Sequence, residues 1–428
     1  MDAFVLHGPV RLAGTVAASG AKNAALPALA AALLTPEPVS LAGVPDVADV
    51  RTMGALLEGA GVAVGRPAPG CVTLRADRIA STEAPYDLVR TMRASILVLG
   101  PLLARFGEAR VSLPGGCAIG VRPVDLHLAA MEAMGARIAV EKGYIHAHVS
   151  RVSSARGRLQ GTEISFPLPT VTGTENVLFA AALARGRTVL HNAAIEPEVV
   201  DTAALLSRMG ARITGAGTRT ITVDGVESLG GTGERPHAVV PDRIEAGTFL
   251  AAGAITGGDV TVTNARAGDL EAFLDALRRA GVEVEAGPDS VRVRRAGPLR
   301  AADVRTAPHP GFPTDLQAQF LALMTQAEGA SRIVETIFEN RFLHVPELVR
   351  LGADVRLDGH TAVVRGPTPL EGAPVTASDL RASAALVLGG LVARGETRVR
   401  RIYHLDRGYD DMDGKLRTLG ASVERIPG

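Results

Sequence analysis

The sequence predicts an α/β fold with two lobes, in which six repeated units are arranged three plus three. The first observation is a helical pattern that ends in glycine and is followed by an alternating apolar strand. It occurs six times in 428 residues, with the closing glycines 68 to 75 residues apart. Such a regular period indicates a structural repeat. The closing glycines are Gly61, Gly135, Gly210, Gly281, Gly352 and Gly420.

Each closing glycine is well suited to the left-handed conformation that ends a helix. The second observation is a nearly uncharged helical pattern before each of these helices. Because a helix that is apolar on all sides is usually buried, we expect one such helix at the centre of each unit. The predicted buried helices span residues 24–34, 94–106, 175–184, 245–256, 316–327 and 380–393.

The third observation concerns the two ends of the chain. The sixth unit lacks the extended segment that closes the third, fourth and fifth, because the chain stops at Gly428, whereas residues 4–8 form a strand pattern without a unit of its own. We therefore expect one lobe at 21–231 and a second at 1–20 and 232–428, completed by the N-terminal strand. The segment Gly230-Gly231-Thr232-Gly233 has the composition of a hinge between the two lobes. Two joined lobes also predict a ligand cleft between them.

Composition excludes several classes of function. The 45 basic and 45 acidic residues cancel, which gives no electrostatic footprint for nucleic acid or an anionic membrane. Two cysteines are too few for a disulfide framework, and the N-terminus lacks the pattern of a secretory signal. The longest apolar stretches have about a dozen residues, fewer than the roughly 20 that span a bilayer. The expected compartment is the cytoplasm.

Residues 112–127 have the composition of a reactive loop. Three glycines and two prolines disfavour regular structure here, and Cys117 lies five positions before Arg122. A guanidinium group near a thiol favours the thiolate, which suits proton transfer or attack on an electrophile. The other interpretation is a buried, inert cysteine.

Lysine is rare in this chain: only Lys22, Lys142 and Lys415 occur, beside 42 arginines. Lys22, in Ser-Gly-Ala-Lys-Asn, therefore suggests a position that needs a compact ammonium group close to a phosphate or carboxylate. A solvated lysine at a helix start is the alternative.

Three further motifs carry charge. Arg90 and Arg93 share a predicted helix face, where they could bind a diphosphate or form an ordinary surface pair. Asp315 follows three prolines at a helix start, and it is either an N-cap or first-turn residue or a catalytic base. In Asp379-Leu380-Arg381 and Asp406-Arg407, ion pairing and anion binding explain the pattern equally well.

Together these motifs resemble the signature blocks of the UDP-N-acetylglucosamine 1-carboxyvinyltransferases, the family of enolpyruvyl transferases that begins peptidoglycan precursor synthesis. The resemblance covers the whole chain and implies the family's fold, a pair of inside-out α/β barrels with three units each. The blocks are residues 19–23, 90–95, 113–127, 242–245, 309–319, 335–342, 379–383 and 402–409.

The resemblance implies transfer of the enolpyruvyl group of phosphoenolpyruvate to the 3′-hydroxyl of UDP-N-acetylglucosamine, with release of phosphate. This reaction is the first committed step of peptidoglycan synthesis and so serves cell wall biogenesis, cell shape and division. It implies these two small-molecule substrates as partners and neither metal nor cofactor.

Residue roles follow from the matched positions. The implied catalytic groups are Cys117 as general acid, Asp315 as the base for the sugar hydroxyl, and the cations Lys22 and Arg407. The implied phosphoenolpyruvate ligands are Lys22, Asn23, Arg122, Arg381 and Arg407. The implied UDP-N-acetylglucosamine ligands are Arg93, Arg122, Pro123, Val124, Asp125, Leu126, Asp315 and Ile337.

One segment departs from the family pattern. Leu168 stands where many relatives have a nucleotide-binding lysine, which puts contacts from residues 168–171 in doubt. The rival functions are the sister enzyme that acts on shikimate phosphate, a paralogue that uses another nucleotide, and a non-catalytic nucleotide-sugar-binding regulator. The sister enzyme's relatives lack the Pro-Gly-Gly-Cys loop found here at residues 114–117.

Overall fold

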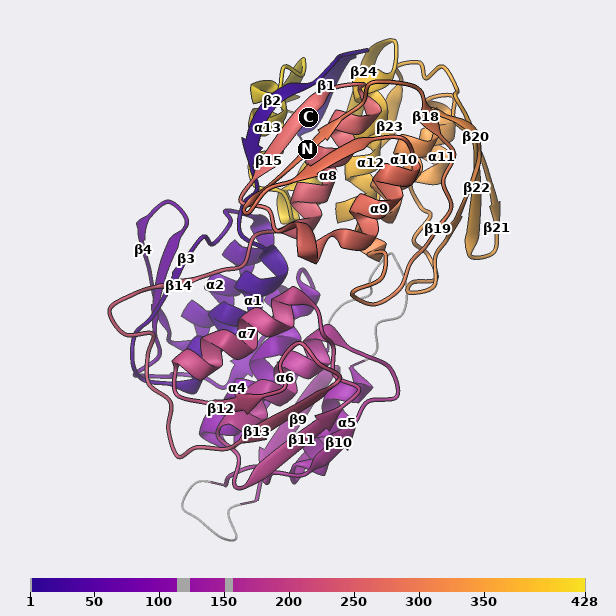
Figure 1. Cartoon of the computed structure of the whole chain (residues 1–428). Coiled ribbons are helices and arrows are strands. Elements are labelled where there is room, and N and C mark those ends of the chain that lie inside the picture. The colour runs from indigo at the N-terminus through magenta and orange to yellow at the C-terminus, as the bar shows by residue number, and fades with distance from the viewer. Residues whose placement is uncertain (1, 114–123, 151–156, 428) are drawn as a thin grey trace. The chain divides into compact units, whose positions relative to one another are not determined.

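The computed structural model describes residues 2–113, 124–150 and 157–427 (Figure 1). The chain forms two compact units, each with its own hydrophobic core. Unit 1 contains residues 2–19 and 241–427, and unit 2 contains residues 20–113, 124–150 and 157–240. The glycine-rich segment at 230–233 therefore lies inside unit 2, because the chain still adds strand β14 (His237–Ala238) to a sheet of that unit before it leaves.

The other elements of unit 2 run from residue 22 to residue 224. Its helices are α1 (Lys22–Ala31), η1 (Ala32–Leu34), α2 (Ala48–Ala60), α3 (Tyr86–Val89), η2 (Arg93–Val98), α4 (Leu99–Phe106), α5 (Asp125–Ala133), α6 (Val171–Ala182) and α7 (Pro197–Arg208). Its strands are β3 (Val39–Ala42), β4 (Ala63–Ala68), β5 (Cys71–Arg75), β6 (Glu83–Ala84), β7 (Glu108–Ser112), β8 (Ala136–Glu141), β9 (Tyr144–Val149), β10 (Glu163–Ser165), β11 (Arg187–His191), β12 (Arg212–Thr214) and β13 (Thr220–Asp224).

Unit 1 combines both ends of the chain. Its helices are α8 (Arg243–Ile255), η3 (Ala267–Asp269), α9 (Glu271–Arg279), η4 (Thr314–Leu316), α10 (Gln317–Met324), α11 (Val345–Arg350), α12 (Leu380–Val392), η5 (Ile402–Arg407) and α13 (Met412–Thr418). Its strands are β1 (Ala3–Gly8), β2 (Ala13–Ala17), β15 (Asp259–Thr263), β16 (Glu283–Ala286), β17 (Ser290–Arg294), β18 (Leu299–Arg300), β19 (Val304–Arg305), β20 (Ala327–Val334), β21 (Asp354–Asp358), β22 (Thr361–Gly366), β23 (Pro374–Thr376), β24 (Gly395–Arg400) and β25 (Val423–Ile426).

The described strands form six sheets, three in each unit, and all six share one pattern of pairing. A parallel pair lies at one edge and two antiparallel pairs follow it, as in β10-β11-β13-β12 and β14-β3-β5-β4. In the order β23-β24-β1-β25, β1 occupies the third position, so the first strand of the chain lies between two of its last strands. None of these sheets closes on itself in the described part of the chain, so the barrel of the predicted fold is not a continuous ring of strands.

The buried helices lie where the apolar pattern predicts them. In unit 1, α8, α10 and α12 contact one another, and nearly every residue of each is buried. The segment 94–106 departs from the prediction, because its first half is the 3-10 helix η2 rather than an α-helix. Pro101 explains the change, since it has no N–H to donate and its ring would crowd the carbonyl of residue 97 in a continuous helix.

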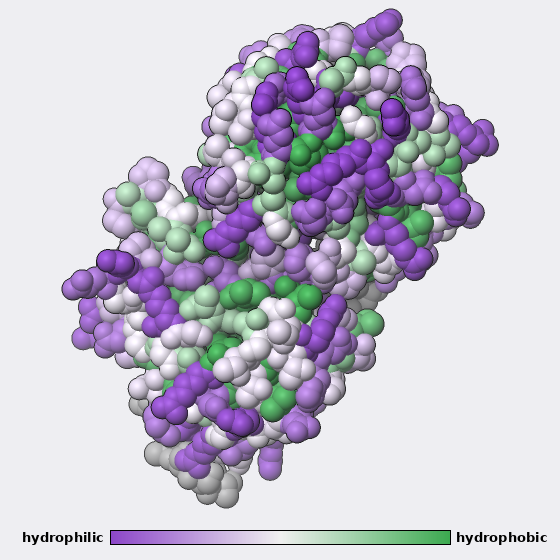
Figure 2. Space-filling model, viewed as in Figure 1, coloured by the Kyte–Doolittle hydropathy of each residue, from purple (hydrophilic) through white to green (hydrophobic). Residues whose placement is uncertain are grey.

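The closing glycines confirm the turn prediction. All six adopt positive φ, between 86° and 107°. Gly61 is the clearest case, because a Cβ there would come within 2.7 Å of the Arg78 carbonyl oxygen. On the face seen in Figure 2, hydrophilic residues (purple) and hydrophobic residues (green) are intermixed on the surface of both units.

Candidate active site

Asp315 lies in the first turn of η4, directly before α10. The N-cap of η4 is Pro313 and that of α10 is Leu316, so the first-turn assignment is confirmed and the N-cap assignment is wrong. The proline-rich loop before it places this carboxylate at the N-terminal end of a buried helix.

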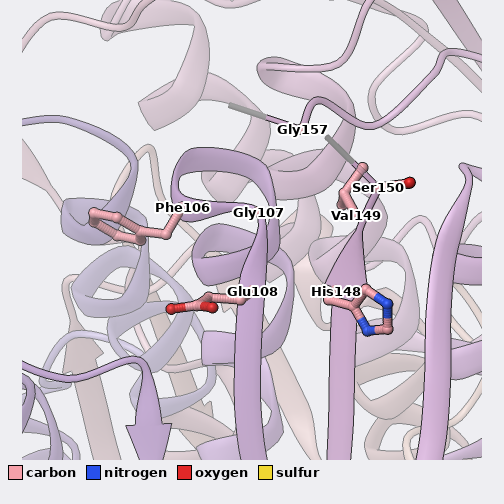
Figure 3. Close-up of a pocket in the computed structure, with 7 residues that line it drawn as sticks. All are labelled: Phe106, Gly107, Glu108, His148, Val149, Ser150 and Gly157. Atoms are coloured by element: carbon pink, nitrogen blue, oxygen red, sulfur yellow. The ribbon is translucent and has the colours of Figure 1, made fainter. Parts of the chain in front are cut away.

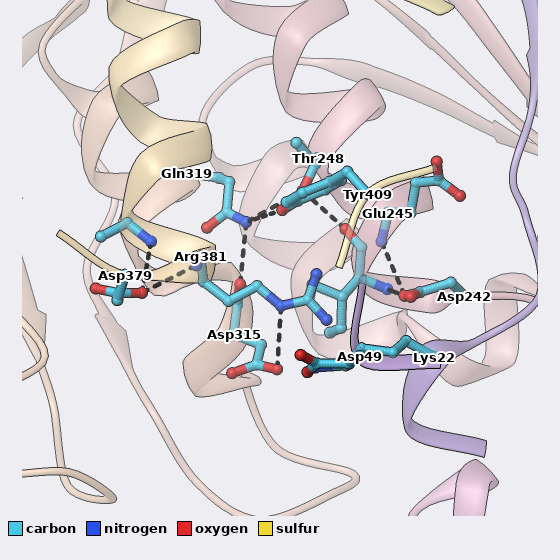
Figure 4. A network of polar contacts seen from close by, with 12 residues as sticks. Lys22, Asp49, Asp242, Glu245, Thr248, Asp315, Gln319, Asp379, Arg381 and Tyr409 are labelled. Carbon is cyan, nitrogen blue, oxygen red and sulfur yellow. Dashed lines mark hydrogen bonds and ion pairs between the residues drawn. The ribbon is translucent and has the colours of Figure 1, made fainter. Parts of the chain in front are cut away.

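Two buried arginines hold the Asp315 carboxylate, one on each oxygen. Arg341 Nη2 lies 2.6 Å from Oδ1 and Arg381 Nε lies 3.3 Å from Oδ2. The two arginine side chains are 4% and 3% exposed, whereas the Asp315 side chain is 27% exposed. The carboxylate is therefore fixed in orientation and still accessible to a ligand. Figure 4 shows its contact with Arg381.

One hydrogen-bond donor of Arg381 is not used by the described residues. Its Nη1 atom is buried and has no hydrogen-bond partner among the described residues. Burial alone lowers the pKa of Arg381, but Tyr409, Asp315 and Asp242 raise it above the usual range, so the group stays charged. A buried guanidinium group with an unused N–H is suited to bind a carboxylate or phosphate.

Asp379 does not pair with its neighbour Arg381. Its Oδ1 instead accepts from the backbone N–H groups of Arg381 and Ala382, at 2.9 and 3.0 Å, and so caps α12. Local ion pairing is therefore wrong for this motif. The cap frees the Arg381 side chain to reach Asp315.

Sequence reasoning missed the polar network behind Arg381. The guanidinium carbon of Arg381 lies 5.3 Å from the centre of the Tyr409 ring. The Tyr409 hydroxyl is 3.0 Å from Thr248 Oγ1 and accepts a 3.2 Å hydrogen bond from Gln319 Nε2, which also donates to the Asp315 carbonyl (Figure 4). The available signal was that Thr248 and Gln319 are polar residues within the mostly apolar helices α8 and α10.

Arg407 ends η5 in unit 1, and its neighbour Asp406 bonds to Arg425. Asp406 thus pairs with an arginine that lies 19 residues away in the sequence. Ile337 follows β20, and its backbone N–H donates to Glu335 Oε1 at 2.8 Å.

Lys22 is the first residue of α1 in unit 2, with Asn23 next to it. The residue is only 8% exposed, and its Nζ lies 3.1 Å from Oδ2 of the buried Asp49 on α2. The alternative of a solvated lysine is therefore wrong. Asp49 was not expected, because only folding brings these two helices together.

Arg93 and the start of α5 form a second cluster in unit 2. Val124 precedes α5, Asp125 and Leu126 begin it, and His127 is buried. Burial and the nearby charge of Arg93 lower the pKa of His127 to about 4, so this imidazole is neutral at pH 7.

Hydrogen bonds define the His127 tautomer. Asn176 Nδ2 donates to the Ile96 carbonyl at 3.0 Å and lies 2.8 Å from His127 Nδ1, so Nδ1 accepts. The imidazole proton is then on Nε2, which faces Thr172 Oγ1 at 3.3 Å.

Arg90 and Arg93 do not share a helix. Arg90 follows α3 and pairs with Asp87 at 3.5 Å, whereas Arg93 begins η2. Between them Met92 is extended, with φ −140° and ψ 108°, which separates the two helices. The shared-face prediction is wrong, and Arg93 alone reaches the His127 cluster.

Three predicted residues, Cys117, Arg122 and Pro123, lie outside the described residues. Leu168 is 68% exposed in the loop before α6, whose N-cap Thr170 accepts from the Gly173 N–H.

A pocket of about 390 Å³ in unit 2 contains none of the predicted residues (Figure 3). Its lining residues are Phe106, Gly107, Glu108, His148, Val149, Ser150 and Gly157.

In the described part of the chain, no group of three or more His, Cys, Asp or Glu side chains is placed to hold a metal ion. No helix among the described residues has both the length and the apolar character needed to cross a membrane.

The chain is similar to known proteins along its whole length. A family model described as EPSP synthase (3-phosphoshikimate 1-carboxyvinyltransferase) matches residues 6–416. UDP-N-acetylglucosamine 1-carboxyvinyltransferases from Solibacter usitatus (strain Ellin6076) and Magnetococcus marinus (strain ATCC BAA-1437 / JCM 17883 / MC-1) are 57% and 55% identical over 427 residues, which is 100% of each chain.

Two solved structures show a similar fold. The enolpyruvyl transferase NikO from Streptomyces tendae is 29% identical with a TM-score of 0.88, covering 100% of this chain and 99% of that one. EPSP synthase from Acinetobacter baumannii is 17% identical with a TM-score of 0.76, covering 100% of both chains, and supports the fold alone.

Proposed function

This chain belongs to the UDP-N-acetylglucosamine 1-carboxyvinyltransferase family of enolpyruvyl transferases, and on that premise we propose its reaction and the residues that perform it. It transfers the enolpyruvyl group of phosphoenolpyruvate to the 3′-hydroxyl of UDP-N-acetylglucosamine and releases phosphate. The structural observation that supports this most is the Asp315 carboxylate, which is oriented by two buried arginines and remains accessible.

Asp315 accepts the proton of the sugar hydroxyl as that oxygen bonds to C2 of phosphoenolpyruvate. Cys117 gives a proton to C3, and the product of this addition is a tetrahedral ketal. The C2–O bond to phosphate then breaks and C3 loses a proton, which restores the double bond. Acid and base thus act on opposite sides of one double bond.

The cations of the site stabilise the anionic substrate and the leaving phosphate. Arg381 offers its unused Nη1 donor to the carboxylate, and Lys22, Arg122 and Arg407 neutralise the phosphate and carboxylate. Asn23 lies beside Lys22 in the chain and contacts the reacting centre.

The nucleotide sugar uses a separate set of groups. Arg93 binds the diphosphate, and the nearby His127 is neutral at pH 7 and adds no charge of its own. The backbone of Ile337 contacts the sugar nucleotide. Arg122, Pro123, Val124, Asp125 and Leu126 hold the uracil.

The test is phosphate release from phosphoenolpyruvate with a panel of acceptors. We expect UDP-N-acetylglucosamine to support turnover and shikimate 3-phosphate to give none, as the 57% identity to the UDP-sugar enzymes favours. Turnover with a different nucleotide sugar only, or binding without turnover, would favour the paralogue or the regulator instead. We further propose that the protein acts in the cytoplasm, where peptidoglycan precursors begin.

A further inference from the structure

Glu335 is a buried carboxylate that only neutral groups satisfy. It follows β20, is 1% exposed, and accepts four hydrogen bonds. No ion pair with a basic side chain involves it in the described part of the chain. Because an unpaired buried charge is expensive unless it is fully hydrogen-bonded, such an arrangement indicates a position where the exact geometry of the donors matters.

The two oxygens of Glu335 bind different segments. Oε2 accepts from Thr314 Oγ1 at 2.9 Å, and Thr314 immediately precedes Asp315. Oε1 accepts from the backbone N–H groups of Ile337 and Phe338, at 2.8 and 3.2 Å. One carboxylate therefore sets the spacing between the Asp315 segment and the Ile337 backbone.

Both ends of the loop that leads to Asp315 meet at this carboxylate. Thr306, at the start of the loop, donates from Oγ1 to Glu335 Oε1 at 3.0 Å, and Thr314 is at its end. Thr336 reinforces the first end, since its N–H donates to Thr306 Oγ1 at 2.8 Å and its hydroxyl donates to the Thr306 carbonyl at 2.6 Å. Prolines at 308, 310 and 313 restrict the backbone between these anchors.

The chain after Glu335 returns to Asp315 by a second route. Arg341, six residues later, contacts Asp315 Oδ1 at 2.6 Å. Asp315 is thus held through its own carboxylate by Arg341 and through the preceding threonine by Glu335.

We propose that Glu335 is a positioning residue, which acts through Thr314 to place the Asp315 carboxylate relative to the nucleotide-sugar contact at Ile337. This rests on the proposed function of Asp315 and Ile337. Glu335 itself touches neither substrate. A misplacement of about 1 Å in such a group costs on the order of 100-fold in rate.

The decisive variant is Thr314→Val, which keeps the shape of the side chain and removes only the bond to Glu335. We expect kcat to fall about 10- to 100-fold. The KM for UDP-N-acetylglucosamine should stay within about 3-fold of that of the unaltered protein, because the hydrogen bond between the Ile337 N–H and Glu335 is intact. Thr314→Ser restores the hydroxyl and should restore kcat. Thr397→Val is the control for the same substitution, since Thr397 is a buried threonine of unit 1 whose Oγ1 has no partner among the described residues.

A Glu335→Gln variant tests the carboxylate itself. Its amide oxygen can accept from the Ile337 and Phe338 N–H groups while its amide nitrogen donates to Thr314 Oγ1, so the geometry can be retained with the charge removed. We expect its kcat to stay closer to that of the unaltered protein than the kcat of Thr314→Val.

A double-mutant cycle shows whether Thr314 acts through Asp315. Adding Thr314→Val to Asp315→Asn should cost little further kcat, because the group being positioned is already disabled. Full additivity, unchanged kcat in Thr314→Val, or no rescue by serine would overturn the positioning role. The proposed function fails separately, if the unaltered protein releases no phosphate from the two substrates. Thermal melting of each variant identifies a loss that comes from unfolding.

Discussion

The ammonium group of Lys415 lies 2.6 Å from Oε1 of Glu245, and the two side chains are 18% and 2% exposed. Oε2 of Glu245 accepts from the Ser19 N–H at 2.6 Å, and Lys415 also donates to Ser19 Oγ at 2.7 Å. Ser19 is the last residue of unit 1 before the chain enters unit 2. These hydrogen bonds therefore anchor the departing chain to helix α8.

The first prediction concerns the pH dependence of this anchor. Burial raises the pKa of Glu245 from 4.5 to about 7, although Lys415 opposes the shift. Between these values the folded protein binds a proton that the unfolded chain does not. The contribution of Glu245 to the free energy of unfolding is therefore complete below pH 4.5 and is lost as the pH rises to about 7.

Urea denaturation from pH 4.5 to 8 measures this contribution. Glu245→Gln should reduce the decline of the free energy of unfolding with rising pH. Glu424→Gln, at an exposed position, should leave this decline unchanged. In Lys415→Met the pKa of Glu245 should rise further, so that the decline extends to higher pH. Identical profiles for Glu245→Gln and the unaltered protein would contradict the assignment.

The second prediction concerns the base. Asp315→Asn should fold, bind the nucleotide sugar and lose about 10²-fold or more in kcat, the usual scale for a general base. Steady-state phosphate release and a binding titration separate the two properties. Asp358→Asn, an exposed aspartate of the same unit, is the control. Near-normal turnover in Asp315→Asn would remove this carboxylate from the mechanism.

The third prediction concerns the anion site. Arg381→Lys preserves the charge but removes the planar guanidinium group. That group contacts Asp315 through Nε, and its Nη1 donor has no partner among the described residues. The KM for phosphoenolpyruvate should rise about 10-fold or more, the equivalent of one charged hydrogen bond. We expect the same direction for Arg122→Lys and Arg407→Lys. Arg398, whose side chain is 42% exposed and pairs with Glu396, supplies the control substitution Arg398→Lys. Unchanged kinetics in the three site variants would indicate structural ion pairs.

The fourth prediction concerns the thiols. An epoxide phosphonate that mimics phosphoenolpyruvate should alkylate Cys117, because its phosphonate binds the same cations, and the reaction should be faster with the nucleotide sugar present. Cys71, partly exposed at the start of β5, is the internal control. Intact-mass measurement with peptide mapping identifies the modified residue. Labelling of Cys71, or of both thiols equally, would contradict a reactive Cys117.

Local signals in the sequence predicted the repeated helices well. Gly61 and its five counterparts were predictable because a helix end requires left-handed backbone, and this depends on one residue. The Asp315 site was only half predictable. Its first-turn position follows from the loop before it, but its arginine partners are 26 and 66 residues away.

Glu335 shows the same limit more sharply. In the sequence it is one acidic residue in a matched block, and nothing nearby indicates that it binds Thr306 and Thr314. Only the pairing of β20 with β19 brings these segments together. Contacts of this kind depend on tertiary structure, which neither propensity nor periodicity encodes.

The position of β1 between β24 and β25 affects the order in which the protein can fold during synthesis. Strand β1 must wait for strands that are synthesised much later, because its two neighbours begin at Gly395 and Val423. In the described part of unit 2, no strand pairs with a strand that lies beyond residue 240, so this unit can fold while translation continues. A nascent chain stalled before residue 395 should therefore hold a protease-resistant unit 2 beside an incomplete unit 1 whose N-terminal strand remains available to a chaperone.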